Sequence, residues 1–122
     1  MRNLQNKILG KIGEEIAAEY LQSQGLRIIE RNFSKRYTEL DIVADDKNTL
    51  VFVEVKTRIG TKFGLPEEAI TPWKLKTLVR SAHYYNLLHP QHQGPMRIDV
   101  VSLILTKNHE VEKLKWIKNV TG

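Results

Sequence analysis

Three residues whose chemistry suits phosphodiester cleavage lie close together in the sequence: Asp41, Glu54 and Lys56. Asp41 lies in the run TELDIVADD, and the other two lie in the run TLVFVEVKT. The second run is otherwise apolar on both faces, as is typical of a central buried strand, so its charges need a partner. Mg²⁺ and Mn²⁺ bind carboxylate oxygens together with waters and substrate phosphate. We therefore interpret Asp41 and Glu54 as metal ligands.

The short turn at residues 46–49 joins the two runs and predicts a hairpin. Its register places Asp41 opposite Glu54 and Glu39 opposite Lys56, and the period of two puts all four side chains on one face. Directly opposed carboxylates repel each other unless a cation lies between them. The hairpin register therefore favours a bound metal between these two carboxylates.

A lysine and a further acid complete the predicted catalytic set. Lys56 would position the attacking water and stabilise the charge that develops on the phosphate. Glu14 falls in line with Ala17, Ala18 and Leu21 on the inward face of a predicted helix. We predict catalytic roles for Glu14, Asp41, Glu54 and Lys56.

The alternative is a structural ion-pair network in which Lys56 neutralises Asp41 and Glu54 without any metal. Buried charges usually persist only when they are paired. Three acids that converge on one lysine would leave a net negative pocket, and this imbalance favours the metal.

Hydrophobic periodicity supplies the elements that position these residues. A 3.6-residue period predicts helices, whereas period-two and β-branched runs predict strands. The expected fold class is α/β, a central mixed sheet of about five strands flanked by helices. In chain order the predicted elements are a helix over 5–24, strands over 26–33, 38–45 and 49–57, a helix from Pro72 to Pro90, and strands over 97–105 and around 114–116.

Composition predicts one cytoplasmic domain over residues 1–122. The chain has no cysteine, which excludes disulfides and thiolate zinc sites. Charges interrupt every apolar stretch at the N-terminus, so we expect no signal peptide and no membrane partner. The net charge of +5 favours an anionic partner such as nucleic acid.

Basic residues are concentrated just after the proposed site. From residue 56 to residue 90 they outnumber the acids, which are only Glu67 and Glu68. A solvated helix face would explain this band, and because the band lies beside the proposed site, a surface that contacts phosphates explains it about equally well. Arg58 and Lys62 are the expected nucleic-acid contacts.

Several motifs together resemble a known family. ELDIVADD and LVFVEVK resemble the PD-(D/E)XK nuclease signature, with Glu54 thirteen residues after Asp41 and Lys56 two further on. GKIGEEIAAEYL, the pair Arg31 and Asn32, IDVVSLI and WIKNV are similar to the bacterial YraN-like family, which is related to archaeal Holliday junction resolvases.

The resemblance implies a restriction-endonuclease-like fold and a Mg²⁺- or Mn²⁺-dependent endonuclease that acts on DNA, including branched or distorted DNA. It implies that Asp41 and Glu54 bind the metal with the backbone carbonyl of Val55, and that Lys56 is the motif lysine. The Gln-x-x-x-Tyr element of exonuclease relatives is absent after Lys56, which favours an endonuclease. A non-catalytic nucleic-acid-binding module that keeps this fold is the alternative.

Two further expectations concern the tryptophans and the oligomeric state. Trp73 and Trp116 could stack on unpaired bases, but core packing is the preferred interpretation for both. A two-fold homodimer is also expected, because so small a domain offers little surface to hold a branched substrate. Its predicted interface combines residues near the last strand and the second helix, namely Trp116, Ile117, Tyr84, Tyr85, Leu87 and Leu88.

Overall fold

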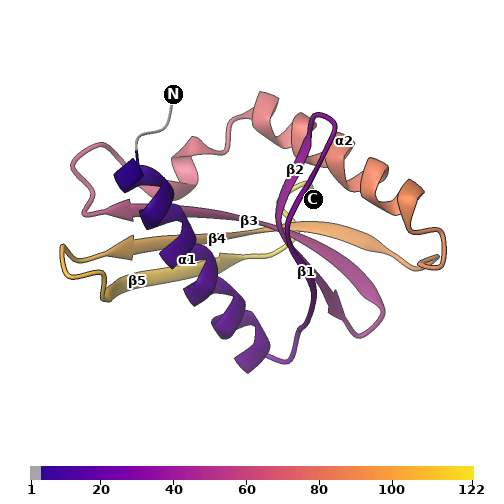
Figure 1. Ribbon diagram of the computed structural model, residues 1–122, viewed down its shortest axis with the longest axis horizontal. Coiled ribbons are helices and arrows are strands. Elements are labelled where there is room, and N and C mark those ends of the chain that lie inside the picture. Colours follow the sequence, from indigo (N-terminus) through magenta and orange to yellow (C-terminus); the bar gives the residue numbers. More distant parts are fainter. Residues whose placement is uncertain (1–3) are drawn as a thin grey trace.

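A five-stranded mixed sheet in the order β1-β2-β3-β4-β5 forms the middle of the computed structural model, which describes residues 4–122 (Figure 1). Strands β3 and β4 are parallel and every other neighbouring pair is antiparallel. The predicted order of helices and strands is confirmed, with one short helix, η1, added before α2. Residues 1–3 of the predicted domain lie outside the described residues. The elements are α1 (Leu4–Ser23), β1 (Arg27–Lys35), β2 (Thr38–Asp46), β3 (Thr49–Ile59), η1 (Pro66–Ala69), α2 (Pro72–Leu88), β4 (Met96–Leu105) and β5 (Val111–Ile117).

The two long helices cover opposite faces of the sheet. The core under α1 contains Leu21 together with Val53 and Val101 of the central strands. The core under α2 contains Leu78 and Tyr85 packed with Phe52. Alternate residues of β3 enter different cores, which explains why this strand is apolar on both faces. Among residues 4–122, no helix is long and apolar enough to cross a membrane.

Helix α1 approaches β3 most closely at Gly13. A Cβ atom at this position would overlap Oγ1 of Thr57 on β3, so only glycine fits. The neighbouring residue in the helix is Glu14, which is half-buried. The contact between Gly13 and Thr57 therefore fixes how far Glu14 stands from the sheet.

Strand β2 leaves β3 before its own N-terminal end. The ladder between them runs from the Asp46–Thr49 pair to the Ile42–Val53 pair, and β2 then remains paired with β1 alone. In β1, Asn32 has a positive φ of 54°, which Asn adopts more readily than most residues. The register places Asn32 across from Asp41, so this kink coincides with the separation. Figure 1 shows the β1–β2 hairpin rising away from the sheet.

The buried carboxylate of Asp99 joins the two C-terminal motifs, IDVVSLI and WIKNV. Asp99 on β4 is 0% exposed and accepts hydrogen bonds from Nε of Arg97 at 3.0 Å, Nε1 of Trp116 at 3.0 Å and the backbone N–H of Asn119 at 2.9 Å. Arg97 also donates to Asp46 at 2.9 Å. A buried charge with these partners is compensated, and it ties β4 to the end of β5 and to the β2–β3 turn.

The surface predicted for a homodimer is not one surface. Tyr85 is buried in the core under α2, whereas Trp116 packs against the core under α1 on the other face of the sheet. Only Leu87 and Leu88 of the predicted set are among the exposed large hydrophobic residues. The predicted patch is therefore wrong as a contiguous interface, although core packing of Trp116 is confirmed.

The close approach of α1 to β3 makes a prediction about Gly13. Gly13→Ala would lower the free energy of unfolding by about 1 to 3 kcal/mol, because overpacking costs more than the roughly 1 kcal/mol that alanine gains in a helix. The double variant Gly13→Ala/Thr57→Ala would regain part of that loss, since Oγ1 of Thr57 is the atom in the way. Urea denaturation of Gly13→Ala, Thr57→Ala and the double variant measures both effects. Strictly additive losses would contradict the assignment.

Candidate metal centre

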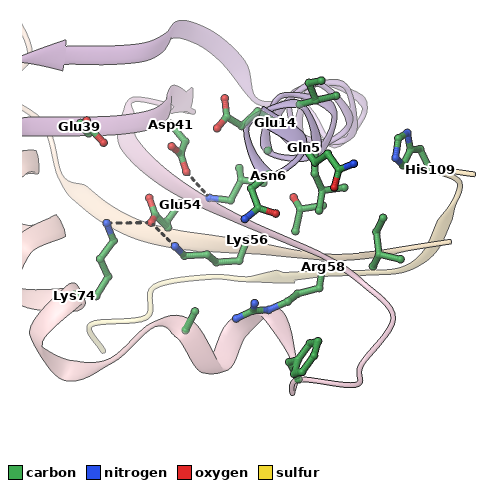
Figure 2. Close-up of a pocket in the computed structure, with 18 residues that line it drawn as sticks. Gln5, Asn6, Glu14, Glu39, Asp41, Glu54, Lys56, Arg58, Lys74 and His109 are labelled. Atoms are coloured by element: carbon green, nitrogen blue, oxygen red, sulfur yellow. Dashed lines mark hydrogen bonds and ion pairs between the residues drawn. The ribbon is translucent and has the colours of Figure 1, made fainter. Parts of the chain in front are cut away.

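A cavity of about 860 Å³ lies between the first half of α1, the second half of β3 and the segment that leads to α2. It brings together the four residues predicted to be catalytic, Glu14, Asp41, Glu54 and Lys56, along with Val55. Figure 2 shows the three acids at one end of this cavity, contributed by three different elements. The predicted set therefore converges in space.

Where β2 leaves β3, the side chain of Asp41 replaces the backbone acceptor that β2 would otherwise offer to Val55. Its Oδ2 accepts a hydrogen bond from the backbone N–H of Val55 at 2.9 Å. Burial, and after it the nearby charge of Glu54, raise the pKa of Asp41 to about 8, while the Val55 N–H opposes both effects. In the metal-free protein at neutral pH, Asp41 therefore carries a proton.

Glu54 is buried between two ammonium groups. It is 6% exposed, and its Oε2 lies 3.5 Å from Nζ of Lys56 and 3.3 Å from Nζ of Lys74 (Figure 2). The predicted pairing of Lys56 with Glu39 is wrong, because the β2–β3 ladder ends before these two residues and Lys56 turns to Glu54 instead. Glu39 lines the same cavity.

Lys74 is the residue of this site that the sequence analysis placed only in the basic band. It lies in the first turn of α2, where Thr71 caps the helix by accepting from the Lys74 N–H at 3.1 Å. The signal available in the sequence was the Thr-Pro helix start, which fixes where the first-turn side chains project. The sequence could not indicate that this turn faces β3.

The start of α2 is anchored to the sheet through Glu67 of η1. Its carboxylate accepts hydrogen bonds from Nζ of Lys115 and Oγ of Ser102, each at 2.6 Å. These two donors lower the pKa of Glu67 to about 2, and Lys115 has the larger effect. The segment between β3 and α2 is thereby held against β4 and β5, which helps to keep Lys74 beside Glu54.

The peptide of Val55 has the orientation that the metal interpretation needs. The N–H and C=O groups of one strand residue point toward the same neighbouring strand. Because the Val55 N–H points to Asp41, its carbonyl also faces the gap left by β2. Two carboxylates and one carbonyl thus border the place where the β2–β3 ladder stops.

The donor set fits a hard cation, with solvent completing the coordination. Within residues 4–122, no three His, Cys, Asp or Glu side chains are close enough together to hold a metal by themselves. Two carboxylates with a carbonyl, waters and phosphate are the ligands typical of Mg²⁺. Binding would displace the proton of Asp41 and weaken the contacts of Glu54 with Lys56 and Lys74.

The cavity holds less excess negative charge than the sequence predicted. Glu14, Asp41 and Glu54 face Lys56 and Lys74, so the acids have two ammonium partners rather than one. Proton uptake by Asp41 reduces the imbalance further. The metal-free site is therefore close to charge balance.

Of the two predicted phosphate contacts, Arg58 lines the cavity and Lys62 lies in the segment that follows β3. Arg58 lies further along β3 than Lys56 (Figure 2). Lys62 has its Nζ 5.7 Å from the ring centre of Phe63, and Phe63 also lines the cavity. Arg58 thus shares the cavity with the acids, whereas Lys62 lies next to Phe63 and is not itself part of the lining.

Comparison with known sequences identifies one family. The family model described as "Uncharacterised protein family UPF0102" matches residues 13–103, a stretch that contains every acid and lysine of the cavity discussed above. A UPF0102 protein of Syntrophomonas wolfei is 48% identical over 100 residues, which cover 82% of this chain and 87% of the relative. A UPF0102 protein of Clostridium botulinum strain Loch Maree is 43% identical over 93% of this chain and 94% of its own, and one of Caldanaerobacter subterraneus is 38% identical over 98% of each.

The raised pKa of Asp41 predicts how the stability of the metal-free protein varies with pH. Between about pH 4 and pH 8 the folded state holds a proton that the unfolded state has lost, so the free energy of unfolding falls as pH rises through this window. Above about pH 8 the contribution levels off. Asp41→Asn cannot ionise and would be increasingly more stable than the parent as pH rises.

Urea denaturation in EDTA between pH 5 and pH 9 measures this difference. Asp45→Asn on the same strand is the matched control, and its offset from the parent would not change across the window. An offset for Asp41→Asn that is equally constant would contradict the assignment.

Proposed function

The chain belongs to the UPF0102 family, and from this premise and the geometry of the cavity we propose that it is a metal-dependent endonuclease that hydrolyses phosphodiester bonds in DNA. The observation that carries the proposal is the convergence of Asp41, Glu54 and Lys56 at the point where β2 leaves β3. The resemblance to the PD-(D/E)XK signature and to the YraN-like relatives of Holliday junction resolvases supports it. Branched or distorted DNA is the proposed substrate class.

Asp41, Glu54 and the carbonyl of Val55 are the proposed ligands of Mg²⁺ or Mn²⁺. The bound cation would act as a Lewis acid on the scissile phosphate and lower the pKa of a coordinated water. The protein supplies two negative side chains and one carbonyl dipole, and leaves the rest of the coordination sphere open to water and phosphate. This open side faces the cavity.

Lys56 is the proposed catalytic cation. When a metal occupies Glu54, the ammonium group of Lys56 remains on the same side of β3 and can turn to the attacking water or to a phosphate oxygen. Lys56 already lines the cavity, so its ammonium group starts within the proposed site. Glu14, held at its depth by Gly13, is proposed to orient water at the same end of the cavity.

Arg58 and Lys62 are proposed to contact the phosphates on either side of the scissile bond. Phosphate contacts of this kind set the position of the backbone and carry no sequence information. They contribute affinity that declines as salt is added, because each one releases condensed counterions. The net charge of +5 is in keeping with such a polyanionic substrate.

A non-catalytic nucleic-acid-binding module is the second candidate, and one observation favours it. Glu54 already has two ammonium partners, so the metal-free site is satisfied as an ion-pair network. A protein that had lost catalysis could retain these residues for stability alone. The two candidates differ in turnover and in metal binding, which makes them separable.

Cleavage of a DNA panel distinguishes them. We expect the protein with Mg²⁺ or Mn²⁺ to cut at least one of duplex, single-stranded, flap and four-way-junction DNA, with no cleavage in EDTA. Asp41→Asn and Glu54→Gln would each lower the cleavage rate by about 10² to 10³-fold, and Lys56→Ala would lose most cleavage yet keep DNA affinity within a few-fold.

Glu19→Gln, an exposed acid of α1, is the matched control and would cut normally. Gel assays of cleavage and of binding are run on the same preparations. If the folded parent protein binds DNA but cuts no member of the panel with either metal, the nuclease proposal is wrong and the non-catalytic binding module is supported.

A further inference from the structure

An aromatic ring and two cations lie in line on the outer face of α2. Trp73, Lys76 and Arg80 are three and then four residues apart, a spacing that places side chains on one face of a helix. All three are exposed, and the buried residues of the helix, such as Leu78, Ala82 and Tyr85, point the other way into the core. We call these three residues the outer stripe.

Trp73 is 74% exposed, so core packing, the interpretation preferred from the sequence, is wrong for this residue. Its backbone is held firmly, because its carbonyl accepts from Oγ1 of Thr77 at 3.1 Å and Pro72 precedes it in the first turn. A large ring on a fixed backbone and exposed to water is well suited to stacking. Little conformational entropy is lost when such a ring binds.

The outer stripe begins beside the candidate metal centre. Trp73 directly precedes Lys74, whose Nζ lies 3.3 Å from Oε2 of Glu54. Phe63, which is 82% exposed and lines the cavity, places a second accessible ring at the segment before α2. A chain that leaves the cavity toward α2 would therefore meet Trp73 first.

The charge of the helix favours a polyanion over a protein partner. Helix α2 has no acidic residue along its 17 positions, and the outer stripe has a cation about 4.5 Å and another about 10 Å along the axis from Trp73, from the rise of 1.5 Å per residue. A stacking ring next to cations is typical of surfaces that hold single-stranded nucleic acid. A duplex keeps its bases stacked on one another and offers none to Trp73.

We propose that the outer stripe binds a single-stranded segment of DNA, with an unpaired base stacked on Trp73 and phosphates against Lys76 and Arg80. This inference rests on the proposed function and refines it, since it requires unpaired nucleotides next to the scissile phosphate. Flaps, gaps and open junctions contain such nucleotides. Fully paired duplex does not.

Fluorescence titration with oligothymidylate in EDTA tests the proposal without any dependence on metal or cleavage. Binding would quench the emission of Trp73, whereas Trp116, half-buried under α1 and hydrogen-bonded to Asp99, would contribute a nearly constant background. Anisotropy of a labelled oligothymidylate gives the affinity. Trp73→Ala would weaken it about ten-fold, and Trp73→Phe would retain most of it because the stacking face is kept.

The cations have their own test. Lys76→Gln and Arg80→Gln would each reduce the slope of log affinity against log salt by about 0.7 for a single strand. Lys47→Gln removes the same charge from the β2–β3 turn, away from the outer stripe, and would leave the slope unchanged.

Two results would overturn the proposal: affinity for oligothymidylate that is unchanged in Trp73→Ala, or equal quenching by a blunt duplex of the same length. Cleavage of DNA by a protein that gives either result would leave the proposed nuclease function standing. Quenching by oligothymidylate without cleavage of any DNA would instead support binding at the outer stripe and contradict the proposed nuclease activity.

Discussion

Two carboxylates buried at the end of a β-ladder are the constraint on which the rest of this structure depends. Glu54 is buried and Asp41 is half-buried beside it, so the charge of Glu54 disfavours a second negative charge on Asp41. The metal-free protein resolves this conflict with a proton on Asp41, the N–H of Val55 and the two lysines beside Glu54. Each of these is a group that a divalent cation would displace or release, so the same arrangement that is stable without metal leaves room for it.

Several distant contacts maintain that gap. Gly13 allows α1 to lie close against Thr57, Asn32 provides the kink where β2 turns away, and Glu67 holds the segment before α2. Asp99 joins Trp116 and Asn119, which explains why the two C-terminal motifs occur together although neither lines the cavity. The motifs that are distant from the acids therefore shape the scaffold and do not contribute to the cavity itself.

Local pattern was sufficient to predict the elements and most of the site. The short β2–β3 turn and the period of two fixed the hairpin register, which the Ile42–Val53 and Asp46–Thr49 pairs confirm. The inward position of Glu14 followed from helix spacing. By contrast, the pairing of Glu39 with Lys56 failed because a register argument assumes that two strands stay together to their ends, and the kink at Asn32 involves a third strand.

Lys74 and Trp73 could not be placed from sequence for a related reason. Both lie in the first turn of α2, and which of two adjacent residues faces Glu54 depends on how the helix is rotated on the sheet. Tertiary contacts that include Glu67 with Ser102 and Lys115 contribute to that orientation. A large aromatic residue in an amphipathic helix is ordinarily buried, which is why core packing was expected for Trp73.

The central claim is that a divalent cation binds in the gap between Asp41 and Glu54. Backbone amide NMR with substoichiometric Mn²⁺ tests it most directly, because the paramagnetic ion broadens only resonances near its site. The account predicts selective loss of the amide signals of Asp41, Glu54, Val55 and Lys56, with that loss abolished in Glu54→Gln. Broadening centred on another part of the chain, or none at all when Mn²⁺ is raised to millimolar concentration, would contradict it.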